Sequence, residues 1–152
     1  MSVTHDFEDM LELLAKHRAR YLIVGGMAFT YHARPRHTKD MDLWVDRSEG
    51  NRRRVNRALT EFGSPLLLEH GELNQILQIG VAPNRIDILS RIEGVRFDTA
   101  WRRRVRGPYG GVPANWIDID SLIRAKRRLD GPRHREDVRV LRQIKALRKR
   151  RT

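Results

Sequence analysis

Two aspartates stand two residues apart in a stretch that otherwise has the composition of a buried strand. The sequence DMDLWV alternates Asp40 and Asp42 with apolar side chains. Because successive side chains of a strand point to opposite faces, both carboxylates would leave one face while Met41 and Leu43 enter a core from the other. Two neighbouring carboxylates repel each other unless a cation lies between them. The pair therefore suits a hard divalent cation such as Mg²⁺, which prefers oxygen ligands and also binds phosphate.

A third carboxylate lies in a second apolar stretch. Asp87 stands between Ile86 and Ile88 in the sequence NRIDILSRI, so it too can leave a sheet from a single face. Two acids from one strand and one from a neighbouring strand can hold two metal ions for in-line phosphoryl transfer. Asp-x-Asp pairs also occur in ordinary loops, so the carboxylates alone leave a structural role open.

A glycine pair precedes the first two acids. Gly25 and Gly26 follow the apolar run RYLIV and open a helical stretch. Backbone N–H groups at the start of a helix lie at the positive end of its dipole and receive phosphate well. The same two glycines could also serve only to allow a tight bend.

Hydrophobic periodicity predicts the elements that would carry these residues. Strands are expected at about 20–24, 40–45, 74–80 and 84–92, and the end of a further strand at about 115–119. Helices are expected at about 6–18, 27–33, 48–62, 97–105, 120–129 and 135–149. Ser48 and Asp120 are expected as helix N-caps, Gly63 just beyond a helix C-terminus, and 107–113 as a loop. This order predicts an α/β or α+β domain in which helices flank one central mixed β-sheet.

Composition narrows the class of protein further. A chain of 152 residues is expected to form one domain, with its core at about 20–140 and a basic tail at about 146–152. It has no cysteine, which excludes a disulfide framework and a thiolate metal site. No apolar run approaches the roughly 18 residues of a membrane span, and no signal-peptide pattern opens the chain, so a cytoplasmic location is expected. The net charge of +12 suggests a polyanionic partner, although an arginine bias can also reflect codon composition.

Taken together, these motifs resemble a known family. The string VGGMAFTYHARPRHTKDMDLWV, followed later by RIDIL, resembles the DNA polymerase β-type nucleotidyltransferase superfamily. Within it, the chain is most similar to the small bacterial and archaeal branch related to AbiEii-type toxins, which often has an Arg-x-Thr-x-Asp-x-Asp string. Arg36, Thr38, Asp40 and Asp42 match that string. The later Leu-Ile-x-x-Lys pattern and the acid that follows it are matched by Lys126 and Asp137, so the resemblance covers about 20–140.

The resemblance implies a fold and a set of site residues. In this nucleotidyltransferase fold, an NTP would lie between the Gly25–Gly26 helix start and two Mg²⁺ ions, for which Mn²⁺ could substitute. Asp40 and Asp42 would bind both metals, while Asp87 would bind the catalytic metal and assist deprotonation of the acceptor hydroxyl. Lys126 would steady the triphosphate as a point charge. A solvated surface lysine is the other interpretation of Lys126, and Asp137 could be either an acid at a helix N-terminus or a structural partner of Lys126.

The function implied is transfer of NMP from an NTP to a hydroxyl group with release of pyrophosphate. The acceptor would be tRNA or another RNA, or a protein, and the chain would act as a toxin or as an antitoxin-like protein adenylyltransferase. Few residues follow the last predicted helix, so the acceptor site would come from a partner, a homodimer or the basic surface. The rival interpretation is a catalytically silent basic module that binds RNA or protein. Three retained acids that repel one another argue against this rival.

Overall fold

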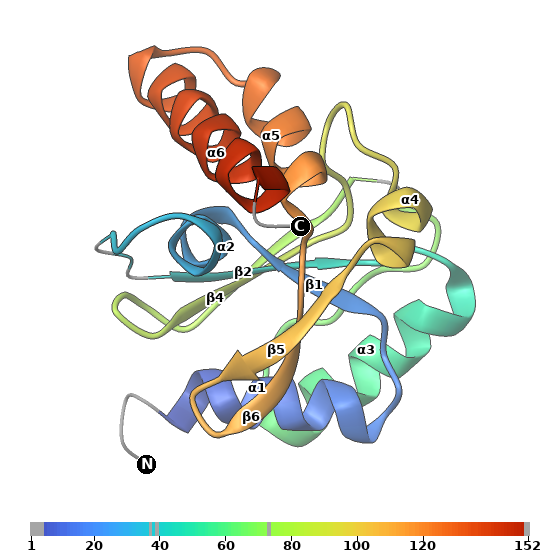
Figure 1. Cartoon of the computed structure of the whole chain (residues 1–152). Coiled ribbons are helices and arrows are strands. Elements are labelled where there is room, and N and C mark those ends of the chain that lie inside the picture. Colours follow the sequence, from blue (N-terminus) through green and yellow to red (C-terminus); the bar gives the residue numbers. More distant parts are fainter. Residues whose placement is uncertain (1–4, 37, 39, 73, 151–152) are drawn as a thin grey trace.

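A six-stranded mixed sheet forms the centre of the molecule, as seen in the computed structural model, which describes residues 5–36, 38, 40–72 and 74–150. The strands lie in the order β3-β4-β2-β1-β6-β5 (Figure 1). They are β1 (Tyr21–Val24), β2 (Asp40–Val45), β3 (Ile76–Ile79), β4 (Arg85–Leu89), β5 (Val105–Tyr109) and β6 (Val112–Trp116). The helices are α1 (His5–Lys16), α2 (Gly25–His32), α3 (Glu49–Phe62), α4 (Phe97–Arg102), α5 (Ile119–Arg127) and α6 (Pro132–Arg150).

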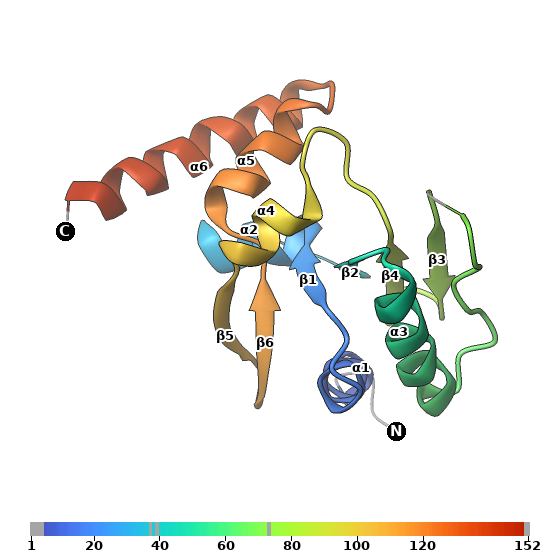
Figure 2. The same cartoon turned by 90° about the vertical axis from the view of Figure 1, so that its right-hand side faces the viewer.

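Helices cover the sheet on both sides. Figures 1 and 2 show α1 and α3 below the sheet and α5 and α6 above it, with α2 beside β2. The buried residues of α1 are Phe7, Met10, Leu11 and Leu14, a spacing of three and four that forms one apolar helix face. Such a mixed sheet flanked by helices confirms the predicted fold class.

The central strand β2 connects the two halves of the sheet. It pairs in parallel with β4, which places Asp42 opposite Asp87, and antiparallel with β1, which places Asp42 opposite Val24. Met41 and Leu43 are fully buried, whereas Asp40 and Asp42 are partly exposed. The alternating residues of DMDLWV therefore lie on two different faces of β2, Met41 and Leu43 in the core and the two aspartates on the open face.

The predicted loop at 107–113 is wrong, because these residues belong to a hairpin of β5 and β6. Gly110 makes the turn with a φ of +56°, a conformation that suits glycine. Pro108 and Pro113 lie opposite each other in the hairpin, and β6 joins the rest of the sheet where Trp116 pairs with Ile23. Proline and glycine lower the strand propensity of this stretch, yet both are tolerated at the edge of a sheet.

The starts of α5 and α6 differ from the predictions, and the predicted cap of α3 makes no capping hydrogen bond. Asp118, not Asp120, caps α5, and its Oδ2 accepts a 3.1 Å hydrogen bond from the Ser121 N–H. Helix α6 begins at Pro132, since proline is well suited to the first turn of a helix. Ser48 precedes α3, but its hydroxyl donates to Asp46 at 3.0 Å and makes no capping bond.

The helix end predicted at Gly63 is confirmed by its left-handed φ of +91°. In the described part of the chain, no helix combines the length and the apolar composition needed to cross a bilayer.

Candidate functional site

Three aspartates leave the sheet at adjacent positions of β2 and β4. The parallel register places Asp42 beside Asp87 and Asp40 beside Arg85. Asp87 is 8% exposed, so its carboxylate is largely withdrawn from water. The structure thus brings Asp40, Asp42 and Asp87 together, as the alternation of acidic and apolar residues predicts.

The glycine turn lies directly against this group of carboxylates. Gly25 has a φ of +68°, and a Cβ atom at this position would lie 2.1 Å from Asp42 Oδ2. At Gly26 a Cβ would lie 2.6 Å from the Thr38 methyl group. A side chain at either position would have to displace that of Asp42 or Thr38. Because Val24, the residue before α2, has a hydrocarbon side chain, it leaves the first N–H groups of the helix uncapped beside Asp42.

The closeness of the carboxylates changes their proton affinity. Burial raises the pKa of Asp42 to about 6, and the negative charges of Asp87 and Asp40 add to this effect. A hydrogen bond with Asp87 also favours the protonated form, while the positive charge of Arg85 acts in the opposite direction. The negative charges of the three aspartates thus lie close together on the open face of β2, and a cation bound there would be stabilised by them.

Sequence reasoning missed Arg85, whose guanidinium lies among these acids. Its Nη2 donates to Asp40 Oδ2 at 2.8 Å and to Asp87 Oδ2 at 3.2 Å. Its Nε forms an ion pair with Asp87 Oδ1 at 3.0 Å. One signal could have revealed it, since Arg85 stands two residues before Asp87 in the same strand and must leave the same face.

The donor atoms present fit a divalent metal ion in kind. Asp40 Oδ1 and Asp87 Oδ1 are buried, and neither accepts a hydrogen bond from the described residues. Carboxylate oxygens are the protein ligands that Mg²⁺ prefers. In their present arrangement, no three His, Asp or Glu side chains of the described residues are placed to hold a metal ion. In the same arrangement, Arg85 forms ion pairs with two of the three acids, Asp40 and Asp87.

Comparison with known proteins settles the fold. No protein-family model and no curated protein matches the sequence. Among solved structures, the chain is similar to a crystal structure of ANT(2″)-Ia in complex with adenylyl-2″-tobramycin, with a TM-score of 0.60 and 16% identity over 96% of this chain and 94% of that one. It is also similar to a solution structure of the antibiotic-resistance factor ANT(2″)-Ia, with a TM-score of 0.58 and 15% identity over 97% of this chain and 91% of that one. This chain has the nucleotidyltransferase fold. The finer similarity to AbiEii-type toxins stays a prediction.

Within this nucleotidyltransferase fold, Lys126 lies in an ion-pair network with Asp137. Lys126 is 8% exposed and its Nζ donates to Asp137 Oδ2 at 2.8 Å, so it is not a solvated surface lysine. The first turn of α6 contains no acid, which makes Asp137 the structural partner of Lys126 and not a helix N-terminal residue. The contacts of the described residues tie Lys126 to Asp137 and to none of the three aspartates, and its predicted contact with a triphosphate stays a prediction.

The same carboxylate also holds Arg36. Arg36 Nη1 donates to Asp137 Oδ2 at 2.9 Å, Nη2 donates to Oδ1, and the guanidinium lies 4.0 Å from the centre of the Phe29 ring. Burial alone would raise the pKa of Asp137, but hydrogen bonds from Arg36 and Lys126 outweigh it and lower the pKa to about 2. Asp137 therefore joins the segment that leads into β2 to the α5–α6 pair.

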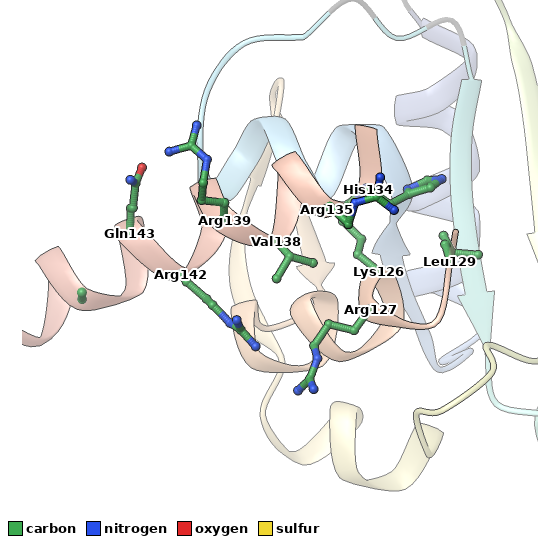
Figure 3. A pocket seen from close by; sticks show the side chains of 10 residues that line it. Lys126, Arg127, Leu129, His134, Arg135, Val138, Arg139, Arg142 and Gln143 are labelled. Atoms are coloured by element: carbon green, nitrogen blue, oxygen red, sulfur yellow. The ribbon is translucent and has the colours of Figure 1, made fainter. Parts of the chain in front are cut away.

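Helices α5 and α6 border a basic cavity of about 630 Å³ (Figure 3). We call it the α5–α6 groove, and its lining residues are Lys126, Arg127, Leu129, His134, Arg135, Val138, Arg139, Arg142, Gln143 and Ala146. The lining contains no acidic side chain, whereas cationic side chains enter it from both helices. Such a surface attracts anions.

Proposed function

We propose that the protein transfers a nucleoside monophosphate from an NTP to a hydroxyl acceptor, with the help of a divalent metal ion. The observation that carries this proposal is the contact between the Gly25 turn and Asp42 inside a group of three carboxylates. An uncapped helix start suits a phosphate group, and clustered carboxylates suit a metal ion. The nucleotidyltransferase fold of the chain agrees with both assignments.

The site residues bind the phosphates, hold the metal ion and accept the proton. The N–H groups after Gly25 and Gly26 bind phosphate, and Lys126 offers a charge for the far end of the triphosphate. Asp40, Asp42 and Asp87 would hold Mg²⁺, which would neutralise phosphate charge. The acceptor oxygen forms a bond to the α-phosphorus as the bond to pyrophosphate breaks. The hydroxyl proton passes to a carboxylate, for which Asp87 is the candidate.

The proposal predicts metal-dependent nucleotide binding. We expect an NTP to stabilise the protein by about 2–3 kcal/mol at a hundredfold excess over its Kd, and only with Mg²⁺ or Mn²⁺ present. The reason is that Asp40, Asp42 and Asp87 repel a triphosphate unless a cation lies between them. Thermal unfolding with and without EDTA measures the effect, and Asp42→Asn serves as the control that should not respond. Equal stabilisation in EDTA would contradict the metal-bridged site.

The α5–α6 groove supports an RNA acceptor with a ribose hydroxyl. ANT(2″)-Ia was solved with an adenylylated aminoglycoside, which is a polyamine, but cations are repelled by a surface such as this groove. Arg127, Arg135 and Arg142 are exposed and line the groove from two helices, an arrangement suited to the phosphates of a single strand. A protein acceptor, a toxin or antitoxin role and a homodimer rest on the sequence alone and stay predictions.

RNA binding should therefore weaken steeply as the salt concentration rises, and it should require the arginines of the α5–α6 groove. Replacing Arg127, Arg135 and Arg142 together by glutamine is expected to reduce the slope of log K against log salt by about 2, at about 0.7 for each lost single-strand phosphate contact. The matched control replaces Arg53, Arg54 and Arg57, three exposed arginines of α3 on the other side of the sheet. Fluorescence anisotropy with a labelled oligonucleotide at several salt concentrations gives both slopes. An equal reduction of the slope in the two triple variants would show that RNA is attracted non-specifically. If the wild type bound no RNA even at low salt, a different acceptor would be favoured.

A further inference from the structure

Arg85 is placed where the carboxylate group needs a positive charge. Strand pairing sets it opposite Asp40, and its guanidinium reaches both Asp40 and Asp87 within 3.2 Å. A guanidinium is a planar fork of donors that can bridge two carboxylates, which an ammonium group does less well. The side chain is nevertheless 33% exposed, against 11% for that of Asp87. Arg85 thus contacts two of the three acids while part of its side chain stays exposed to solvent.

We propose that Arg85 is a positioning residue that holds Asp40 and Asp87 in the metal-free protein and competes with the divalent cation for their oxygens. Arg85 contacts both oxygens of Asp87 and one oxygen of Asp40. A metal ion bound by these two acids has to take oxygens that the guanidinium now occupies. The inference rests on the metal site of the proposed function and adds a regulating residue to it.

Geometry explains why the exchange is feasible. Asp40 Oδ1 accepts no hydrogen bond from the described residues, so Asp40 keeps one donor atom for an incoming metal. Both oxygens of Asp87 lie against Arg85, so Asp87 can bind the metal only as the guanidinium withdraws. The Arg85 side chain is long and partly exposed, and it can turn toward water without uncovering the core. A divalent cation brings two positive charges to the carboxylates, whereas the Arg85 guanidinium supplies one. This difference favours replacement of the guanidinium by the cation. Arg85 therefore sets how much free metal the site requires.

The experiment measures Mn²⁺ binding by calorimetry, without nucleotide, for the wild type and for Arg85→Gln. We expect Arg85→Gln to bind Mn²⁺ about tenfold more tightly, because a cationic competitor close to the carboxylates is removed. The same variant should unfold more easily in EDTA and regain stability when Mn²⁺ is added. Arg91→Gln is the matched control, since Arg91 is exposed, carries the same charge and contacts Asn74 at 3.5 Å. It should bind Mn²⁺ as the wild type does.

Arg85→Lys provides a second test should the glutamine variant fail to fold. It keeps the charge but loses the fork, so its affinity for Mn²⁺ should lie above that of the wild type and below that of Arg85→Gln. Unchanged or weaker binding in both variants would make Arg85 a purely structural ion-pair residue and overturn the inference. In that case a metal-dependent response of the wild type to NTP would leave the proposed function standing. Absence of Mn²⁺ binding in every protein, wild type included, would overturn the metal site and this inference together.

Discussion

Replacing Asp42 by asparagine is expected to stabilise the metal-free protein while abolishing nucleotidyl transfer. The substitution keeps the shape of the side chain and removes one of three neighbouring negative charges. Asp42 lies beside Asp87 in the strand register, so its ionised form is opposed both by burial and by that charge. We expect a gain of about 1 kcal/mol in the free energy of unfolding, a size typical of changes at functional sites. The loss of activity follows from the proposed function, in which the metal site would lose a ligand.

The pH dependence of this gain follows from the direction of the pKa shift. The pKa of Asp42 is raised from 3.8 to about 6 in the folded state. Its contribution to stability is therefore fully present below about pH 4 and is lost as the pH rises through about 6. The wild type in EDTA should lose stability across this window, whereas Asp42→Asn should lose less. The difference between the two proteins should grow from pH 5 to pH 7.5 and is bounded by about 3 kcal/mol for the whole shift.

Denaturant unfolding in EDTA at these two pH values, together with transfer of a labelled nucleotide, measures both effects. Asp46→Asn is a suitable control, because Asp46 follows β2 and accepts hydrogen bonds from Ser48 instead of facing Asp87. Asp46→Asn should keep activity. A destabilised Asp42→Asn that still transfers label would show that the acids are part of the scaffold and that the proposed site is wrong.

Much of the candidate site could be predicted from the sequence, because its signals are local. Alternation in DMDLWV and in RIDIL determines which side chains share a face, and this holds for any sheet that contains the two strands. The glycine pair is equally local, since Gly25 needs a φ that other residues rarely adopt. These signals do not require knowledge of which strands are neighbours.

The features of the site and fold that were not predicted depend on contacts between segments that are distant in the sequence. The contact of Arg85 with Asp40 exists only because β4 pairs in parallel with β2, and the sequence does not show that pairing. Lys126 was predicted to face a triphosphate, yet its visible partner is Asp137 on the next helix. The end of a strand before α5 was predicted, but the β5–β6 hairpin at 107–113 was missed, because neighbouring strands stabilise a stretch whose own propensity is low. The single-domain organisation and the cytoplasmic location stay predictions.

Replacing Asp137 by asparagine is expected to have the opposite effect to that at Asp42 and to destabilise the protein strongly. Asp137 is 1% exposed and is the shared partner of Arg36 and Lys126, whose side chains are 17% and 10% exposed. Removing one member of a buried ion pair leaves the others uncompensated, which costs about 3–5 kcal/mol. For a chain of this size, we expect a fall in Tm of about 10 °C. The segment leading into β2 should also loosen from α6.

The pH dependence separates this role from a packing defect. The pKa of Asp137 is lowered from 3.8 to about 2 in the folded state, so its contribution is fully present above about pH 4 and is lost as the pH falls through about 2. The wild type should therefore lose about 2 kcal/mol of its advantage over Asp137→Asn between these values, whereas a packing defect would persist in acid. Glu136→Gln is the matched control, because the neighbouring Glu136 is exposed and its ion pairs with Arg139 and Arg34 lie in water. It should leave the free energy of unfolding nearly unchanged. An Asp137→Asn protein as stable as Glu136→Gln at pH 7 would mean that the network does not join α6 to the site.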